Sequence, residues 1–239
     1  MIDTHTHLGD DAPEVLARAR AAGVTRVIEV ATSVAGAHAT LERAEREDGV
    51  YACLGVHPHE AADPGDLDEL RGLLAHPRVV AVGETGLDYF RDYAPHDAQQ
   101  RLFDAQLVLA RETGKPVVIH TRNADDDTRE RLLAHDGPVV LHCFSSPPLL
   151  DAALERGWYV SFAGIVTYKN EYDLRAAARL VPHDRVLAET DAPYLAPQPV
   201  RGKRNEAAYV VHTYDVLAEL HGEEIREQIV RNAEEVFRL

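Results

Sequence analysis

Positive charge is scarce in this sequence, and its scarcity limits the possible functions. The 239 residues include 25 lysines and arginines against 40 aspartates and glutamates, which gives a formal net charge of -15. A protein that coats nucleic acid, or that lies on an anionic membrane surface, needs a positive field. The composition therefore argues against both classes, although it is compatible with a small basic site inside an acidic shell.

Cysteines and long apolar runs are also lacking. The only cysteines are Cys53 and Cys143, so we expect no disulfide scaffold and a reducing compartment. The N-terminus has no basic segment followed by an apolar one, and no window is long and apolar enough to span a membrane. We therefore predict a cytoplasmic monomer without a membrane partner.

A regular alternation of β-rich runs and amphipathic helical runs fills the chain. No linker or low-complexity segment divides it, so residues 1–239 are interpreted as one domain. Strands are expected at 2–7, 24–30, 50–56, 79–84, 116–120, 139–142, 158–162 and 186–189, and helices at 12–22, 34–47, 65–75, 96–113, 125–134, 147–156 and 171–180 and within 206–220 and 223–237. Eight such units predict a closed parallel (β/α)8 TIM barrel. The alternative, an open doubly wound sheet, needs a glycine-rich phosphate loop that is missing.

The first strand ends in a pair of histidines. Successive side chains of a strand point to opposite faces, so His5 and His7 share a face. Neutral imidazole is a good ligand for zinc, manganese, cobalt or iron. The pair alone could equally be two solvated histidines at a frayed terminus. The metal interpretation therefore depends on what the later strands supply.

Later strands end in further residues of the types that bind metals. Catalytic groups of (β/α)8 barrels lie at the carboxyl ends of the strands. The candidates at those ends are His57, His59, Glu84, Asp88, His120, Arg122, His142, Cys143 and Asp191. Singly, His120 or His142 could be a core histidine and Asp191 an Asx turn, but together they favour a metal site. Cys143 should point away from His142, toward the helices, and be structural.

Six motifs occur in order along essentially the whole chain. They are His5-x-His7, Gly83-Glu84-Thr85-Gly86-Leu87-Asp88, Val118-Ile119-His120-x-Arg122, His142-Cys143-Phe144, Glu189-Thr190-Asp191-Ala192-Pro193 and Gly202-Lys203-Arg204-Asn205-Glu206. In this combination the sequence resembles the TatD family of metal-dependent deoxyribonucleases, within the wider amidohydrolase-type barrels. Ala207 stands where the family often has proline, and Asn123 where an acidic residue is common. Neither departure removes an expected ligand.

The resemblance implies a hydrolase with two divalent ions. It assigns one ion to His5, His7, Glu84 and Asp191, and the other to Glu84, His120 and His142, with Glu84 bridging. Magnesium-dependent activity is implied by the family, whereas a histidine-rich set favours zinc or manganese, so the metal stays open. Paired metals polarise a phosphoryl oxygen and activate water. Asp191 is then the candidate general base, and Asp88 more plausibly orients a ligand or the substrate.

The substrate implied by the resemblance is single-stranded DNA, trimmed from its 3′ end. Basic residues expected at the barrel mouth favour a phosphodiester: Arg122, Arg201, Lys203 and Arg204. His57 and Asp88 are further candidates for substrate contact, and Phe144 and Tyr89 could either stack on a base or pack in the core.

The sequence alone is also compatible with two other functions. A metal-dependent amidohydrolase, lactonase or deacylase would act on a carbonyl substrate, but such barrels usually bridge their metals with a carboxylated lysine where Glu84 stands here. A non-catalytic scaffold stabilised by metal would have closed coordination, which the sequence cannot test.

Overall fold

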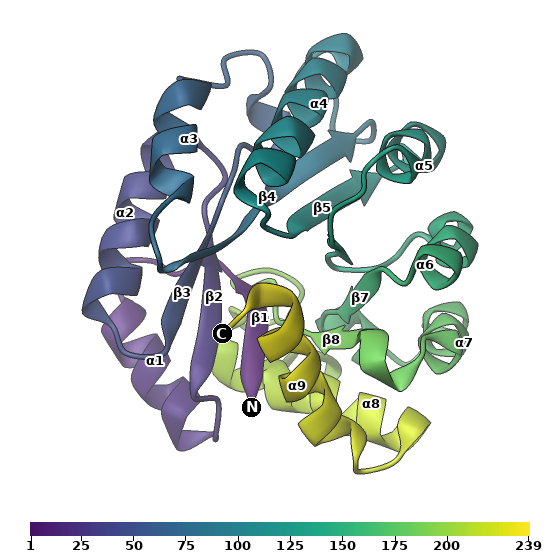
Figure 1. Ribbon diagram of the computed structural model, residues 1–239. Helices are drawn as coiled ribbons and strands as arrows, with labels where there is room; N and C mark the ends of the chain where they lie inside the picture. Colours follow the sequence, from purple (N-terminus) through teal and green to yellow (C-terminus); the bar gives the residue numbers. More distant parts are fainter.

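The computed structural model describes residues 1–239 and contains eight parallel strands that pair in chain order (Figure 1). The strands are β1 (Ile2–Thr6), β2 (Arg26–Val30), β3 (Val50–Leu54), β4 (Val79–Asp88), β5 (Val117–Arg122), β6 (Val139–Leu141), β7 (Tyr159–Phe162) and β8 (Val186–Ala188). Helices separate the strands in sequence, as right-handed parallel connections require. The predicted (β/α)8 barrel is confirmed.

The helices form the outer layer. They are α1 (Ala12–Ala21), α2 (Val34–Arg46), α3 (Leu67–Leu74), α4 (His96–Thr113), α5 (Asp125–Leu133), α6 (Leu150–Arg156), α7 (Tyr172–Leu180), α8 (Val210–His221) and α9 (Ile225–Phe237). Local chemistry sets several ends: Ser33 caps α2 by accepting from the Gly36 N–H, and Gly114 ends α4 in the left-handed conformation. None of these helices has both the length and the apolar composition needed to cross a membrane.

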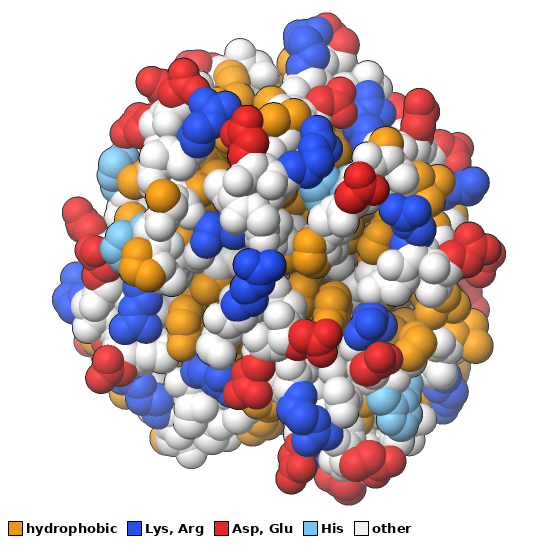
Figure 2. Space-filling model, viewed as in Figure 1, with side chains coloured by type: hydrophobic (Ala, Val, Ile, Leu, Met, Phe, Trp, Pro, Cys, Tyr) orange, Lys and Arg blue, Asp and Glu red, His pale blue; other side chains and the backbone are white.

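The amino-terminal end of the barrel is closed by apolar side chains. Residues from all eight strands converge with three residues of α9 in one cluster: Ile2, Ile28, Val30, Cys53, Val80, Ala81, Val118, Val140, Tyr159, Leu187, Ala233, Val236 and Phe237. In Figure 1, α9 lies in front of the barrel, beside both chain ends. The same face in Figure 2 carries acidic and basic side chains interspersed. The buried side chains that could bind a metal, among them His5, Glu84 and His142, lie at the opposite, carboxyl end.

A seam between β8 and β1 completes the barrel. It has no regular ladder; instead the Asp191 N–H donates to His5 O at 2.9 Å and the His7 N–H donates to Ala192 O at 2.7 Å. Deeper in the seam, the buried Asp3 carboxylate accepts from the backbone N–H and the hydroxyl of Thr190, at 2.8 and 2.6 Å. The seam thus fixes the ends of β1 and β8 against each other.

Strand β4 is longer than the sequence pattern predicted. The pattern ended it at Glu84, but it runs to Asp88, with Thr85 opposite Ile119 and Asp88 opposite Arg122 of β5. Tertiary pairing with β5 overrides the weak strand propensity of glycine in this segment. As a result, Asp88 is anchored on a strand and not on a loop.

Candidate metal centre

The histidines of β1 face two carboxylates at the carboxyl end of the barrel. His5 is fully buried, with Nε2 3.5 Å from Glu84 Oε2 and 3.9 Å from Asp191 Oδ1. His7 Nε2 lies 3.5 Å from the same Asp191 oxygen, and its Nδ1 lies 3.0 Å from the carbonyl oxygen of Val30. Because a carbonyl only accepts, neutral His7 keeps its proton on Nδ1 and presents the lone pair of Nε2 to the site.

Glu84, on β4, lies at the centre of a ring of imidazoles. Its Oε1 is 2.8 Å from His120 Nδ1, 3.3 Å from His142 Nε2 and 3.5 Å from His57 Nε2. Its Oε2 faces His5 on the other side. One carboxylate oxygen thus faces β1 and the other faces β5 and β6, as a bridge between two ions requires.

The imidazole of His5 shows that a cation fits here. Both of its ring nitrogens are buried and have no hydrogen-bond partner, although two carboxylates lie within 4 Å of Nε2. Leaving buried polar atoms unpaired is costly, and a shared divalent ion would satisfy the nitrogen and the carboxylates together. Four groups of three side chains have ligand atoms within 4.8 Å of one another: His5–His7–Glu84, His5–His142–Glu189, His57–Glu84–His120 and His142–Cys143–Asp191.

Carboxylates and imidazoles in this cluster shift one another's pKa values. Burial would raise the pKa of Glu84, but the facing imidazoles, His142 first, hold it well below its usual value. Burial would lower the pKa of His142, but Glu189 and Glu84 raise it well above its usual value. The pKa of His5 is lowered, by burial and by His142. Since metal ligation needs neutral imidazole, filling the site should release protons.

Asp88 lies behind the imidazoles and is held rigidly. Its Oδ2 is 2.8 Å from His59 Nε2 and 3.2 Å from His120 Nε2. Its Oδ1 accepts from the backbone N–H groups of Phe90 and Arg91 at 3.0 and 2.9 Å. His120 is thereby held between Asp88 and the central carboxylate, which is the geometry that an orienting role for Asp88 needs.

Glu189 is a further buried carboxylate at the site, to which the sequence analysis gave no role. Its Oε1 is 2.7 Å from His142 Nδ1 and accepts from the Cys143 N–H at 2.8 Å, so this carboxylate lies directly beside that imidazole. Glu189 directly follows β8 and lies two residues before Asp191, and this position in the sequence could have indicated that it belongs to the site.

The prediction that Cys143 points toward the helices is wrong. Its Sγ lies within 4.8 Å of ligand-type atoms of His142 and Asp191. Strand β6 ends at Leu141, and Cys143 has a positive φ of 44°, so strand alternation no longer applies at this position.

The basic residues at the mouth of the barrel differ in whether their charge is paired with a carboxylate. Arg204 donates to both carboxylate oxygens of Asp11 at 2.6 and 3.1 Å, so its charge is already paired. Arg122, Arg201 and Lys203 have no carboxylate oxygen within 4.0 Å. These three cations are available to a phosphate, and Arg204 is not while its pair persists.

Phe144 and Tyr89, for which stacking on a base and packing were both open, do not present free rings. Phe144 is buried and packs edge-to-face on Phe162, with 6.0 Å between ring centroids. Tyr89 is part-buried, donates to Asp127 at 2.6 Å and is stacked on His96 at 3.8 Å. Both rings serve packing instead.

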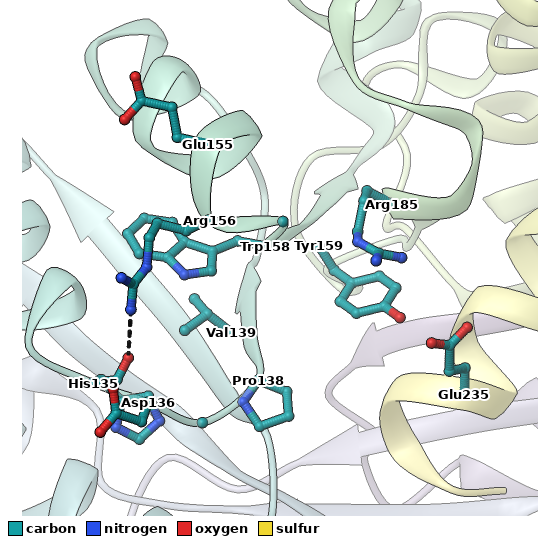
Figure 3. Close-up of a pocket in the computed structure, with 12 residues that line it drawn as sticks. His135, Asp136, Pro138, Val139, Glu155, Arg156, Trp158, Tyr159, Arg185 and Glu235 are labelled. Carbon is teal, nitrogen blue, oxygen red and sulfur yellow. Dashed lines mark hydrogen bonds between the residues drawn. The ribbon is translucent and has the colours of Figure 1, made fainter.

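A cavity of about 550 Å³ lies at the other end of the barrel (Figure 3). Residues 135–139, 155–159 and Arg185, from the segments leading into β6, β7 and β8, line it together with Glu235 of α9. None of the candidate ligands borders it. Since barrel chemistry occurs at the carboxyl ends of the strands, we place the functional site at the histidine cluster.

The sequence matches a family model described as TatD related DNase over residues 2–238. The chain belongs to the TatD family. Among TatD relatives, it is 38% identical to the metal-dependent hydrolase YabD of Bacillus subtilis, covering 100% of this chain and 99% of that protein. It is 36% identical to the 3′-5′ ssDNA/RNA exonuclease TatD of Pantoea vagans, covering 99% and 96%. The protein is therefore a metal-dependent hydrolase.

Solved structures of TatD proteins share the fold. The YjjV structure from Escherichia coli K12, a TatD homologue, superposes with a TM-score of 0.92 at 32% identity and covers 100% of this chain and 98% of its own. A TatD family hydrolase from Entamoeba histolytica gives 0.86 at 20% identity, covering 99% and 97%. The second likeness concerns the fold alone.

Proposed function

We propose that this TatD protein removes nucleotides from the 3′ end of single-stranded DNA, using two divalent ions. The observation that carries the proposal is the central position of Glu84, with His5 on one side and His120 and His142 on the other. The exonuclease name of the Pantoea vagans relative supports the choice of substrate.

The residues divide into two sets around that carboxylate. His5, His7 and Asp191 would hold one ion with Glu84, and His120 and His142 would hold the other. Bound divalent ions supply the positive charge that polarises a phosphoryl oxygen and lowers the pKa of the attacking water.

Asp191 is the residue that we assign as general base. Its pKa is lowered: burial would raise it, but the neighbouring imidazoles of His7, His142 and His5 outweigh that effect. It is therefore ionised at neutral pH and can take a proton on a carboxylate oxygen. The hydrogen bond from its backbone N–H to His5 O fixes it against β1.

We assign the substrate contacts to the unpaired cations at the mouth and to the buried imidazole of His57. Arg122 and Lys203 can bind phosphate oxygens, because neither is engaged by a carboxylate. Arg204 would have to leave Asp11 first. The pKa of His57 is lowered by burial, and its Nδ1 accepts from the His59 N–H, so its neutral ring can donate one hydrogen bond from Nε2 beside Glu84.

The test uses purified protein, 5′-labelled single-stranded DNA and a panel of magnesium, manganese, zinc and cobalt. Stepwise shortening from the 3′ end should require added metal and stop in excess chelator. A generic lactone in the same assay provides the comparison with a carbonyl hydrolase. Hydrolysis of the lactone and not of DNA, or DNA hydrolysis that persists in excess chelator, would overturn the proposal.

A further inference from the structure

The exposed aromatic side chains of this protein are all at one end of the barrel. Four aromatic residues are more than half exposed: Phe90 at 53%, Tyr93 at 63%, Tyr172 at 71% and Tyr194 at 62%. The first two follow β4, Tyr172 begins α7 after β7, and Tyr194 follows β8. The exposed large aliphatic residues lie instead within helices or at their far ends: Val108, Leu133 and Leu180.

Two of these rings lie directly against side chains of the metal centre. The Tyr93 ring packs edge-to-face on His59, with 4.7 Å between centroids, and His59 is paired with Asp88. The Tyr194 ring lies 6.2 Å from that of His7, which faces Asp191. The site therefore has an aromatic wall on its β4 side and another on its β8 side, each with a largely exposed ring.

A third ring positions a cation. The guanidinium of Arg122 lies 3.8 Å above the ring centroid of Phe90. Stacking on an aromatic face fixes the plane of a guanidinium and leaves its N–H edges free for a phosphate. The mouth thus combines flat apolar surfaces with an unpaired, oriented positive charge, in a chain whose net charge is -15.

We propose that Tyr93 and Tyr194 are stacking surfaces for the last bases of a single strand, one on each side of the phosphodiester that is cleaved. The inference rests on the proposed nuclease function and adds what the protein recognises besides phosphate. Every base has a flat π-face, so such surfaces bind without sequence preference. Bases inside a duplex are already stacked on one another, so the same surfaces select unpaired ends.

The test compares an intact oligonucleotide with one that lacks the base at the last or the penultimate position. Removing a base should lower kcat/KM by about 5- to 140-fold, the equivalent of about 1–3 kcal/mol of stacking. Tyr93→Leu and Tyr194→Leu should each lose a similar factor on the intact strand and little on the matching abasic strand. Tyr93→Phe and Tyr194→Phe should recover most of the activity that the leucine variants lose on the intact strand, because the ring remains.

A second readout needs neither metal nor turnover. A terminal 2-aminopurine should lose fluorescence on binding to the wild-type protein in chelator, because stacking quenches it, and should not do so with the two leucine variants. Tyr172→Leu is the matched control, an equally exposed tyrosine at the same end with no contact to the histidine cluster, and should behave as wild type.

The outcomes separate the two proposals. Absence of DNA hydrolysis by the metal-loaded wild type would overturn the nuclease function. Equal hydrolysis of intact and abasic strands, or unchanged 2-aminopurine fluorescence, would overturn the stacking inference and leave the nuclease function standing.

Discussion

Glu84 is the residue that contacts the imidazoles on both sides of the site. Its two oxygens face different sets of imidazoles, so neutralising it should weaken both of the proposed ion positions together. Glu84→Gln is expected to lower metal content from about two ions per chain to less than one, because an amide is a poor bridge between cations. Elemental analysis of protein loaded with manganese and then desalted measures this directly.

The control for that experiment is Glu130→Gln, the same change at an exposed position of α5. It should retain the wild-type metal content. Two ions retained by Glu84→Gln, with activity intact, would show that the bridging assignment is wrong.

Asp191 and Asp88 differ in their surroundings, and the difference predicts different kinetic costs. Asp191→Asn removes a ligand charge and the proton acceptor, so kcat should fall by at least about 10²–10⁴-fold. Asp88→Asn disturbs only the orientation of His59 and His120, which should cost about 10- to 100-fold. Single-turnover rates at saturating metal give the comparison. The reverse ranking would mean that the roles of the two aspartates are exchanged.

The sequence predicted the candidate ligands because strand geometry is local. The spacing of His5 and His7 follows from the period of two, and the others follow from their places at strand ends. The contacts of Glu189 and Cys143 could not be predicted in that way. They depend on how β6 and β8 approach each other and on a left-handed backbone at Cys143, neither of which is encoded in a repeating pattern.

Gly86 allows β4 and β5 to approach closely at the site. It lies in β4 with φ of +136°, and a Cβ there would collide with the carbonyl oxygen of His120. Gly86→Ala is therefore expected to lower the free energy of unfolding by about 2–4 kcal/mol and to displace a candidate ligand. Urea unfolding and metal content are the two measurements.

Gly72→Ala is the matched control. Gly72 lies in the interior of α3, where a Cβ would meet nothing within 4 Å. The change should raise the free energy of unfolding by about 0.5–1 kcal/mol, since alanine loses less backbone entropy in a helix. Similar effects of the two substitutions would contradict the close-approach argument.

Most elements could be predicted to within a residue or two, because hydrophobic periodicity and capping residues are strong local signals. Helix α4 was predicted with the bounds that it has, ended by Gly114. The second half of β4 was missed, since Thr85 and Gly86 resemble a turn until the pairing with β5 is known. Strand length there is a tertiary property, and it is what brings Asp88 to the metal centre.

At the scale of the whole molecule, counting strand–helix units was enough to predict the barrel. It was not enough to predict how the barrel closes. The apolar face of α9 has the pattern of any amphipathic helix, and only the folded chain shows that it covers the end of the barrel. The β8–β1 seam likewise depends on Asp3 and Thr190, which are 187 residues apart.

The charge distribution of the whole molecule also constrains how the proposed DNA substrate would bind. A net charge of -15 repels a polyanion at long range, and lowering the salt from about 0.1 to 0.01 M extends the Debye length from about 10 to 30 Å. Apart from the bound metal ions, electrostatic attraction comes from the unpaired cations at the mouth. We therefore expect a small and local electrostatic contribution to binding.

That expectation can be measured as the slope of log affinity for single-stranded DNA against log salt above about 0.1 M. Each phosphate contact contributes about -0.7, so the two or three contacts offered by Arg122, Arg201 and Lys203 predict about -1.4 to -2.1. Lys203→Ala should make the slope shallower by about 0.7. Arg204→Ala should change it less, because Asp11 already pairs that charge. Arg111→Ala, at the opposite end of the barrel, should leave it unchanged. A slope steeper than about -4 would mean that DNA lies along a broad basic groove and not at a compact end-binding site.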